Sequence, residues 1–306
     1  MVNIFEKLIC DIYINMIHHS FVREVFREIS KLLPDKLYLS LLYYVRFRKW
    51  INWKNPKTFN EKIQWLKIYD RKYIYTEFAD KVAVKDHIEV ILGKDILVPT
   101  LGVFEKIDDI DFSLLPDKFV MKCNHDGGGT SVILCKDKNT FDIDAARKQI
   151  KACMKRNAYW YGREYCYKHI KPCILIEKYL EDSESLKDYK FMVFNGRVKC
   201  SFVCSNREVG SKVNVTFFDL DWNKLPFCRS HPTDQHRICM PINYKKMIEY
   251  SEKIAMELDT SFVRVDFYEV HGVVYFGEVT FYPGSGFEAF QPIEWDRKMG
   301  SWLHLF

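Results

Sequence analysis

Alternating polar residues on two neighbouring segments near the end of the chain form the first candidate site. Arg264 and Asp266 stand two residues apart in one apolar segment, and Glu278 and Thr280 stand two apart in the next. Residues two apart on a strand point to the same face. A three-residue turn centred on Gly272 would pair Asp266 with Glu278. It would also pair Arg264 with Thr280, so two carboxylates and an arginine would meet on one patch.

Such a patch suits metal and phosphate chemistry. Two close carboxylates repel each other unless a cation lies between them, and Mg²⁺ favours one or two carboxylates together with phosphate oxygens. Asp266 and Glu278 are therefore candidate metal ligands, and Arg264 could hold a transferring phosphoryl group. Two alternatives stay open. One is a surface hairpin with alternating polar residues, and the other is a two-residue turn, which would place Val265 opposite Glu278.

A glycine-rich loop follows a lysine at the end of another apolar segment. Lys122 is followed closely by Gly127, Gly128 and Gly129. A lysine beside flexible backbone N–H groups can hold phosphates. The loop lacks the spacing of a P-loop and that of the dinucleotide-binding fingerprint, so a plain glycine-rich turn remains an alternative. His125, within the loop, could contact either substrate or solvent.

A third charged segment lies downstream. An apolar segment ends in four residues: Glu177, Lys178, Tyr179 and Leu180. A strand that leaves the core can present backbone groups to a purine edge, and Glu184 could then accept hydrogen bonds from ribose hydroxyls. Lys190 would add another cation. The alternative is that residues 177–180 end a core strand and carry charged side chains without a binding role.

The elements that must position these residues indicate an α+β fold. The first 75 residues or so have helical spacing, and Thr58 and Glu61 form a capping box. The predicted helices cover 4–29, 35–45, 61–69, 79–92, 144–157 and 244–258. The predicted strands, mostly antiparallel, cover 97–103, 119–123, 132–135, 173–180, 189–195, 198–204, 213–220, 262–270 and 273–281. Turn dipeptides at 195–196 and 271–272 mark two hairpins.

Composition narrows the class of protein. The chain has 306 residues, of which 48% are hydrophobic and 28% charged, with a net charge of +5. These values exclude a disordered chain, and so mild a charge gives little reason to expect a nucleic-acid partner. No apolar run approaches the roughly 18 residues of a membrane span, and the first 20 residues lack the features of a secretory signal. Ten scattered cysteines without a C-x-x-C pair indicate reduced thiols in a reducing cytosol.

One run, over residues 46–54, mixes cations with aromatic side chains and reads RFRKWINWK. It could lie at a membrane interface or hold an anionic glycan or nucleotide. The other interpretation is a solvated connector with aromatic anchors. The membrane alternative would place the chain at the periphery of the inner membrane.

In this order, the motifs resemble the ATP-grasp superfamily. Lys81 resembles its first phosphate-facing lysine, and Lys122 with the glycines resembles its second lysine and flexible loop. Residues 177–180 resemble the hinge that holds adenine. The resemblance assigns ATP contacts to Lys81, Lys122, Gly127, Gly128, Gly129, Glu177, Lys178, Tyr179, Leu180 and Glu184. It assigns Mg²⁺ to Asp266, Glu278 and Thr280, although most members carry Asn where Thr280 stands.

More narrowly, the chain resembles the TupA-like branch, named for teichuronopeptide synthesis. The residues behind this are NPKTFNEKIQWL over 55–66, DYKF over 188–191, YFGEVTF over 275–281 and PGSG over 283–286. The resemblance implies an ATP-grasp fold whose mixed and antiparallel sheets clasp a nucleotide. The expected division is a helical region over 1–75, a pre-grasp segment over 76–110, a glycine-loop lid over 111–180 and a catalytic subdomain over 181–306.

The resemblance further implies a cytoplasmic, ATP-dependent carboxylate–amine ligase that works through an acyl phosphate. Arg264 and Lys190 would be catalytic, and ATP and Mg²⁺ would be needed. The expected partners are a sugar acid or glycan acceptor and an amine donor in surface polysaccharide biosynthesis. Two rival hypotheses remain. Asp219 and Asp221 imitate the D-x-D metal site of glycosyltransferases, and the chain could also be a non-catalytic nucleotide-binding module.

Overall fold

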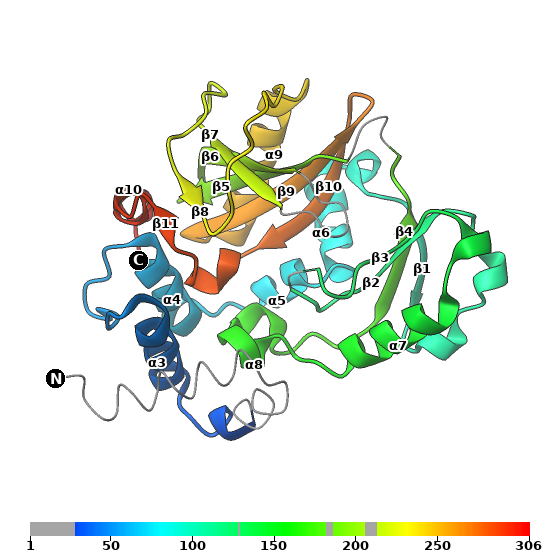
Figure 1. Cartoon of the computed structure of the whole chain (residues 1–306), viewed down its shortest axis with the longest axis horizontal. Helices are drawn as coiled ribbons and strands as arrows, with labels where there is room; N and C mark the ends of the chain where they lie inside the picture. The colour runs from blue at the N-terminus through cyan, green and yellow to red at the C-terminus, as the bar shows by residue number, and fades with distance from the viewer. Residues whose placement is uncertain (1–27, 128, 182–185, 206–212) are drawn as a thin grey trace.

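The computed structural model describes residues 28–127, 129–181, 186–205 and 213–306. These residues form a four-stranded, a five-stranded and a two-stranded antiparallel sheet with helices around them (Figure 1). The α+β class predicted from the sequence is confirmed. The predicted helix over 4–29 falls almost wholly outside the described residues.

The helical region before the sheets contains α3 (Asp35–Phe47) and α4 (Phe59–Tyr69). The predicted capping box is present: the Thr58 side chain accepts from the Glu61 backbone N–H, and the Glu61 carboxylate accepts from the Thr58 backbone N–H. Helix α4 buries Phe59 and Ile63 in the main core, and burying each such side chain contributes about 1.5–3 kcal/mol. It packs against α10 (Glu294–Trp302), which the sequence patterns did not reveal.

The predicted single helix over 79–92 is wrong, because two helices meet there. Helix α5 (Ile74–Ala79) ends before Asp80, and α6 (Ala83–Leu92) begins after it. The Asp80 carboxylate accepts from the Val82 backbone N–H at 2.8 Å and so starts the second helix. The break leaves Lys81 outside both helices, where its backbone N–H donates to the Asn124 carbonyl at 3.2 Å.

The four-stranded sheet has the order β1 (Thr100–Phe104), β4 (Ile174–Lys178), β2 (Phe119–Cys123) and β3 (Ile133–Cys135). Helix α7 (Ile143–Met154) covers one face, where Phe119 and Met121 pack against Ile150. Because side chains alternate along β2, Lys122 points to the opposite face. Strand β1 precedes residue 111, within the expected pre-grasp segment, and pairs with β4.

The five-stranded sheet has the order β10 (Val273–Thr280), β9 (Phe262–Val270), β5 (Asp188–Phe194), β6 (Arg197–Ser205) and β7 (Asn214–Phe218). Helix α9 (Tyr244–Leu258) covers one face, where Tyr244 packs on Phe191 with ring centroids 5.5 Å apart. Alternation along β5 and β9 therefore sends Lys190, Arg264 and Asp266 to the other face.

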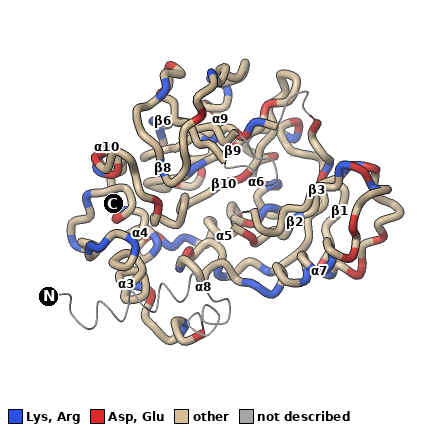
Figure 2. The backbone as a smooth tube through the Cα atoms, in the orientation of Figure 1, with Lys and Arg blue, Asp and Glu red and all other residues tan. Residues whose placement is uncertain are grey.

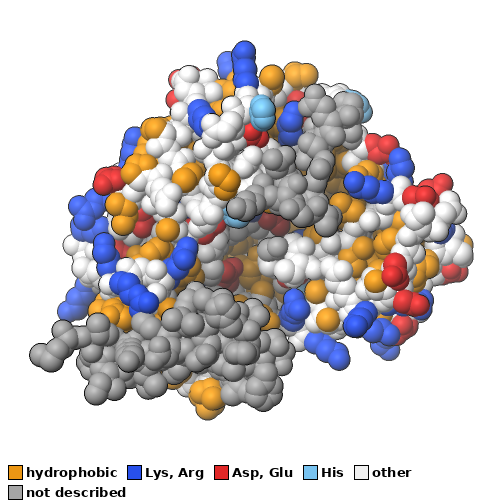
Figure 3. Space-filling view, viewed as in Figure 1, with side chains coloured by type: hydrophobic (Ala, Val, Ile, Leu, Met, Phe, Trp, Pro, Cys, Tyr) orange, Lys and Arg blue, Asp and Glu red, His pale blue; other side chains and the backbone are white. Residues whose placement is uncertain are grey.

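Shorter elements complete the fold. They are α8 (Tyr159–Gly162), β8 (Cys228–Arg229), β11 (Phe290–Gln291), η1 (Lys94–Ile96), η2 (Ile107–Asp109), η3 (Phe112–Leu114), η4 (Lys138–Thr140), η5 (Tyr165–Tyr167) and η6 (Pro283–Gly286). The two large sheets lie on either side of α5 and α6 (Figure 1). A hollow opens between them, and acidic side chains are visible inside it (Figure 3).

Candidate active site

Strands β9 and β10 bring together the residues singled out in the sequence. Glu278 pairs with Asp266 and Thr280 pairs with Arg264, so this predicted pairing is confirmed. The predicted three-residue turn is wrong, because Val270 pairs with Val273 across a two-residue turn. A β-bulge between Phe276 and Glu278 supplies the missing shift of one residue.

Gly277 makes this bulge, and the sequence argument missed it. A Cβ atom at this position would lie 3.0 Å from the Asp266 carbonyl oxygen and 3.3 Å from the Asp266 carbonyl carbon. Both atoms are backbone and cannot turn away. A glycine inside a strand pattern was the available signal, because it often marks a bulge or a close backbone approach.

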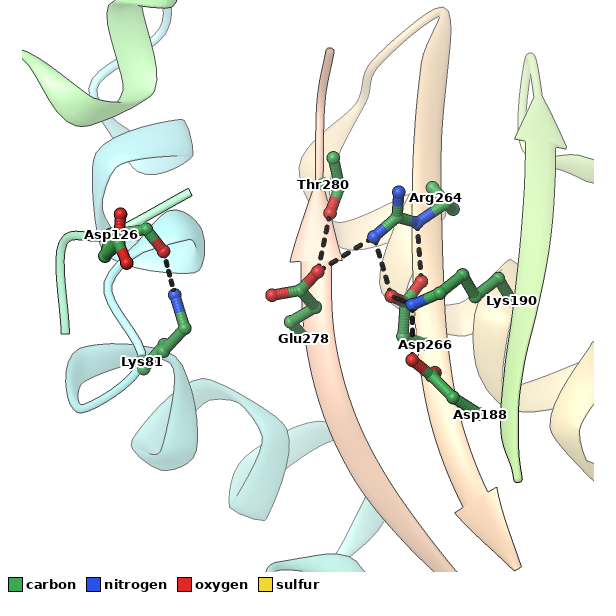
Figure 4. A network of polar contacts seen from close by, with 8 residues as sticks. All are labelled: Lys81, Asp126, Asp188, Lys190, Arg264, Asp266, Glu278 and Thr280. Atoms are coloured by element: carbon green, nitrogen blue, oxygen red, sulfur yellow. Dashed lines mark hydrogen bonds and ion pairs between the residues drawn. The ribbon is translucent and has the colours of Figure 1, made fainter. Parts of the chain in front are cut away.

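The cation between the two carboxylates is Arg264 (Figure 4). Its Nε and Nη2 donate to the two oxygens of Asp266, each at 2.7 Å, and Nη2 also donates to Glu278 Oε1 at 2.8 Å. The sequence pattern predicts Mg²⁺ in this place and Arg264 at the phosphoryl group. In the protein without a ligand, the positive charge of Arg264 neutralises the carboxylates of Asp266 and Glu278 on the same two strands.

A third carboxylate, Asp188, belongs to the same network and was not among the predicted site residues. Lys190 bridges Asp188 Oδ2, at 2.7 Å, and Asp266 Oδ2. Burial lowers the pKa of Lys190, but Asp188 and Asp266 outweigh burial and raise it. The amine is therefore held as a cation. The two-residue spacing of Asp188 and Lys190 along β5 was the signal in the sequence.

Two lysines from outside the five-stranded sheet act on Glu278. Burial would raise the pKa of Glu278, yet Lys81, Arg264, Lys190 and Lys122 together lower it to about 2. Lys81 lies between α5 and α6, and its Nζ donates to the Asp126 carbonyl at 2.6 Å (Figure 4). The positive charges of Lys81, in the loop after α5, and of Lys122, on strand β2, therefore both act on the Glu278 carboxylate of β10.

Lys122 itself is paired with Glu177 from the neighbouring strand. Glu177 is only 5% exposed, and its two oxygens lie 2.6 Å from Lys122 Nζ and 2.5 Å from Lys85 Nζ. Burial would raise the pKa of Glu177, but the two lysines lower it. The family resemblance places Glu177 in the adenine hinge instead, and no sequence pattern singles out Lys85, which lies on α6.

The remaining hinge residues lie where β4 ends. The Lys178 backbone N–H donates to the Pro99 carbonyl at 2.9 Å, and its side chain is exposed. Tyr179 and Leu180 are half-buried. Glu184 and Gly128 lie outside the described residues.

The glycine loop is shaped by its own polar residues. The Asp126 carboxylate accepts from Thr130 and from the Ser131 backbone N–H, and Gly129 has a φ of +75°. A Cβ at Gly127 would lie 3.0 Å from the hydroxyl of Tyr167, a buried residue that the sequence argument missed. His125 is 3% exposed, so contact with solvent is excluded for the protein alone.

A turn after the acidic strand has three residues with positive φ: Gly284, Ser285 and Gly286. Side chains of α4 hold it. Gln64 Nε2 donates to the carbonyls of Ser285 and Gly286, and Lys67 Nζ donates to the Ser285 carbonyl and hydroxyl. These hydrogen bonds hold the turn in one conformation and join the helical region to the site.

The D-x-D motif does not form a comparable site. Asp219 accepts from the backbone N–H groups of Asp221 and Asn223 and so shapes a loop. Within the described ranges, there is no group of three or more His, Cys, Asp or Glu residues arranged to hold a metal. Asp266, Glu278 and Thr280 offer only oxygen donors, which is the chemistry that Mg²⁺ prefers.

Comparisons with solved structures give distant matches. D-alanine–D-alanine ligase from Bacillus anthracis, complexed with ATP, is 18% identical, with a TM-score of 0.41, over 67% of this chain and 55% of that chain. The Helicobacter pylori enzyme is 15% identical over 80% and 69%, with a TM-score of 0.41. The biotin carboxylase domain of 2-oxoglutarate carboxylase from Hydrogenobacter thermophilus is 14% identical over 75% and 46%, with a TM-score of 0.44. This chain thus spans about half the length of the first and third of these.

A family model gives the decisive match. A search of curated proteins finds no significant relative. The model described as TupA-like ATPgrasp, in contrast, matches residues 61–304, which include both large sheets and every described site residue. The resemblance seen in the sequence is therefore confirmed, and the chain, with its ATP-grasp fold, belongs to the TupA-like ATP-grasp family.

Proposed function

We propose that the protein is an ATP-dependent carboxylate–amine ligase that works through an acyl phosphate. The observation that carries the proposal is the position of Glu278. Its carboxylate lies with Asp266 and Arg264 on one face of the five-stranded sheet, and the charges of Lys81 and Lys122 reach it from outside that sheet. Membership of the ATP-grasp family supports the same reaction class.

In this proposal, the lysines hold the nucleotide phosphates. Lys81 and Lys122 offset phosphate charge, Lys122 moving from Glu177 to do so. Strands β2, β3 and β4 belong to a lid over 111–180, whose loop with Gly127, Gly128 and Gly129 closes over the phosphates. Residues 177–180 and Glu184 would hold adenine and ribose. In this proposal, a pre-grasp segment over 76–110 precedes the lid and a catalytic subdomain over 181–306 follows it.

The acidic face of the five-stranded sheet then stabilises the reacting group. Asp266, Glu278 and Thr280 would hold Mg²⁺, which when bound neutralises phosphate charge. Arg264 would turn toward the acyl phosphate and stabilise its oxygens where charge develops. Lys190, kept cationic by Asp188 and Asp266, would add a second fixed positive charge.

The proposed acceptor is a sugar acid or glycan of surface polysaccharide biosynthesis, joined to an amino acid or similar amine. Its support is the resemblance to the teichuronopeptide type. The proposed location is the cytoplasm, and the nine cysteines in the described ranges are all free thiols, as a reducing compartment would leave them. None of the described helices is long and apolar enough to cross a bilayer.

A substrate screen tests the proposal. ADP release is measured with Mg²⁺·ATP against uronic-acid sugars combined with amino acids, and product masses are then taken. We expect a product heavier than the acceptor by one amine minus one water. Asp219→Asn is the matched control, because Asp219 shapes a loop outside the site and its loss should leave turnover intact.

Consumption of a nucleotide sugar without ADP release from ATP would instead favour glycosyl transfer. Nucleotide binding without turnover of any acceptor would point to a binding module.

A further inference from the structure

The loop between α3 and α4 carries an unbroken positive charge. We define the basic loop as residues 46–57, which contain five exposed cations: Arg46, Arg48, Lys49, Lys54 and Lys57. No Asp or Glu occurs between residues 46 and 60. Lys and Arg gather on this connection, at the left edge of the molecule in Figure 2.

The basic loop is held in one conformation. Arg48 closes α3 in the left-handed region, with a φ of 56°, which turns the chain. Ile51 is 6% exposed and packs inward. Trp53 Nε1 donates to Ser40 Oγ at 2.9 Å, and Lys36 Nζ lies 5.3 Å from the Trp53 ring centroid. The cations are therefore displayed on a fixed surface, so little conformational entropy is lost when a partner binds.

The nearest acidic residue in sequence does not neutralise these cations. Glu61 accepts from the backbone N–H groups of Asn52, Lys57 and Thr58. Across the part of the chain that the structure describes, Lys49, Lys54 and Lys57 form no ion pair. These three lysines of the basic loop thus offer their positive charge to an external partner.

An exposed indole stands beside these cations. Trp50 is 53% exposed and stacks on Tyr44, with ring centroids 4.6 Å apart and an interplanar angle of 24°. Tryptophan prefers the boundary between headgroups and acyl chains, where its apolar rings and polar N–H are both accommodated. Cations around a projecting indole match a lipid surface better than a soluble anion, which needs no apolar contact.

The basic loop is joined to the turn beside the candidate active site. Arg46 Nε donates to the Phe287 carbonyl at 2.9 Å, and the Tyr43 and Phe287 rings lie 6.4 Å apart. The four-stranded sheet lies at the opposite end of the molecule (Figure 1). A partner on the basic loop would therefore leave that sheet free to move.

We propose that the basic loop docks the protein on an anionic lipid surface, with Trp50 inserted among the headgroups and the cations facing lipid phosphates. Each lysine near such a surface adds to the attraction. Lys49, Lys54 and Lys57 together give reversible, salt-sensitive binding. The proposal does not depend on the ligase activity.

Vesicle flotation tests the docking. Vesicles of equimolar phosphatidylglycerol and phosphatidylcholine are compared with phosphatidylcholine alone, at low and high salt. We expect binding only to the anionic vesicles, weakened by salt. The triple variant Lys49→Glu, Lys54→Glu, Lys57→Glu should bind at least about 100-fold more weakly, because roughly 3 kcal/mol is lost over the three positions. Trp50→Ala should lower binding with no change in net charge.

The matched control reverses the same number of exposed lysines elsewhere: Lys106→Glu, Lys136→Glu, Lys245→Glu. It should bind nearly as the parent protein does, and thermal unfolding of each variant checks that it is folded. Equal losses in the two triple variants would overturn the proposal, because net charge alone would then explain binding. The proposal would also be overturned if the protein bound soluble polygalacturonate through the basic loop but did not bind vesicles. That result would indicate a glycan site. A loss of flotation that leaves ADP release unchanged separates this proposal from the proposed function.

Discussion

At the scale of single residues, the candidate site depends on charges that meet only in three dimensions. The sequence predicted Arg264, Asp266 and Glu278 as a group because their two-residue spacing is visible along each strand. It missed Asp188 and Lys85, although Asp188 shares the two-residue spacing. Their importance comes from the Lys190 and Glu177 side chains that they contact, and those contacts depend on strand order, which a single sequence does not reveal.

The first prediction concerns the charge of Glu278. The Glu278→Gln variant keeps the shape of the side chain but removes the carboxylate that faces Lys81 and Arg264. We expect Mg²⁺-dependent ADP binding, measured by calorimetry, to weaken strongly, and turnover to fall by about 100-fold or more. Unchanged Mg²⁺-dependent binding would contradict the assignment of Glu278 to the metal site.

The same residue predicts a pH dependence of stability. The folded-state pKa of Glu278 is lowered to about 2, so its contribution is complete above the unfolded pKa of about 4.3 and is lost as the pH falls toward 2. The side chain is 38% exposed, and water screening reduces this contribution to about 1 kcal/mol. Urea unfolding measured between pH 5 and 3 should show a smaller loss in the free energy of unfolding for Glu278→Gln than for the parent protein. Equal losses in the two proteins would refute this.

At the scale of elements, most strands and helices were predictable because their apolar periodicity is strong. Helix α9, the strands β9 and β10 and the hairpin at 195–196 all lie where the sequence placed them. The errors occur where polar side chains interrupt a pattern. Asp80 ends one helix, and its carboxylate accepts from the Val82 backbone N–H just before the next, so one apparent helix becomes two. Strands β8 and β11 have two residues each, too few for periodicity to show.

The second prediction concerns the bulge in β10. Gly277→Ala would force a Cβ against the Asp266 backbone, so strands β9 and β10 must separate or lose the bulge. Without the bulge, Glu278 would face Val265 and leave the metal site. We expect a loss of about 1–3 kcal/mol in the free energy of unfolding, together with loss of Mg²⁺-dependent ADP binding.

Gly272→Ala is the matched control for this substitution. Gly272 has a φ of +77°, so alanine there is also strained, by roughly 1 kcal/mol. It lies in the turn, far along the strands from the site, and should lose stability while keeping nucleotide binding. If both variants bind nucleotide normally, the bulge does not set the geometry of the site.

At the scale of the whole molecule, the helical region before the sheets supports the candidate active site. Lys67 on α4 is fully buried and holds the turn over 283–286, which follows strand β10. The sequence showed α4 and its capping box but gave no sign of this contact, because Lys67 reads as an ordinary polar position on an amphipathic helix. Lys67 becomes important only because α4 packs on the turn over 283–286.

The third prediction follows from the burial of Lys67. Burial lowers its pKa to about 8, below the unfolded value of about 10.4. Between these values the unfolded chain binds more protons than the folded one, so stability should rise as the pH increases from 8 to 10, by up to about 3 kcal/mol. Lys67→Met should reduce this rise and cost about 1–3 kcal/mol, because Ser285 loses its donor. Burial also lowers the pKa values of Lys62, Lys81 and Lys85, which keep part of the rise. Thermal unfolding across this pH range measures both effects, and an undiminished rise in Lys67→Met would contradict the prediction.

The bulge at Gly277 also separates two tasks that one hairpin usually combines. Alignment of β9 and β10 beside the carboxylates is set at the bulge, while the exposed His271-Gly272 tip joins the two strands and contacts the rest of the protein through the Gly272 carbonyl, which accepts from Asn243 Nδ2 at 2.8 Å. The tip should therefore accept a grafted peptide, such as an epitope or a small fluorescent tag, without disturbing the acidic pair. The protein thus has a natural attachment point for following its location in living cells.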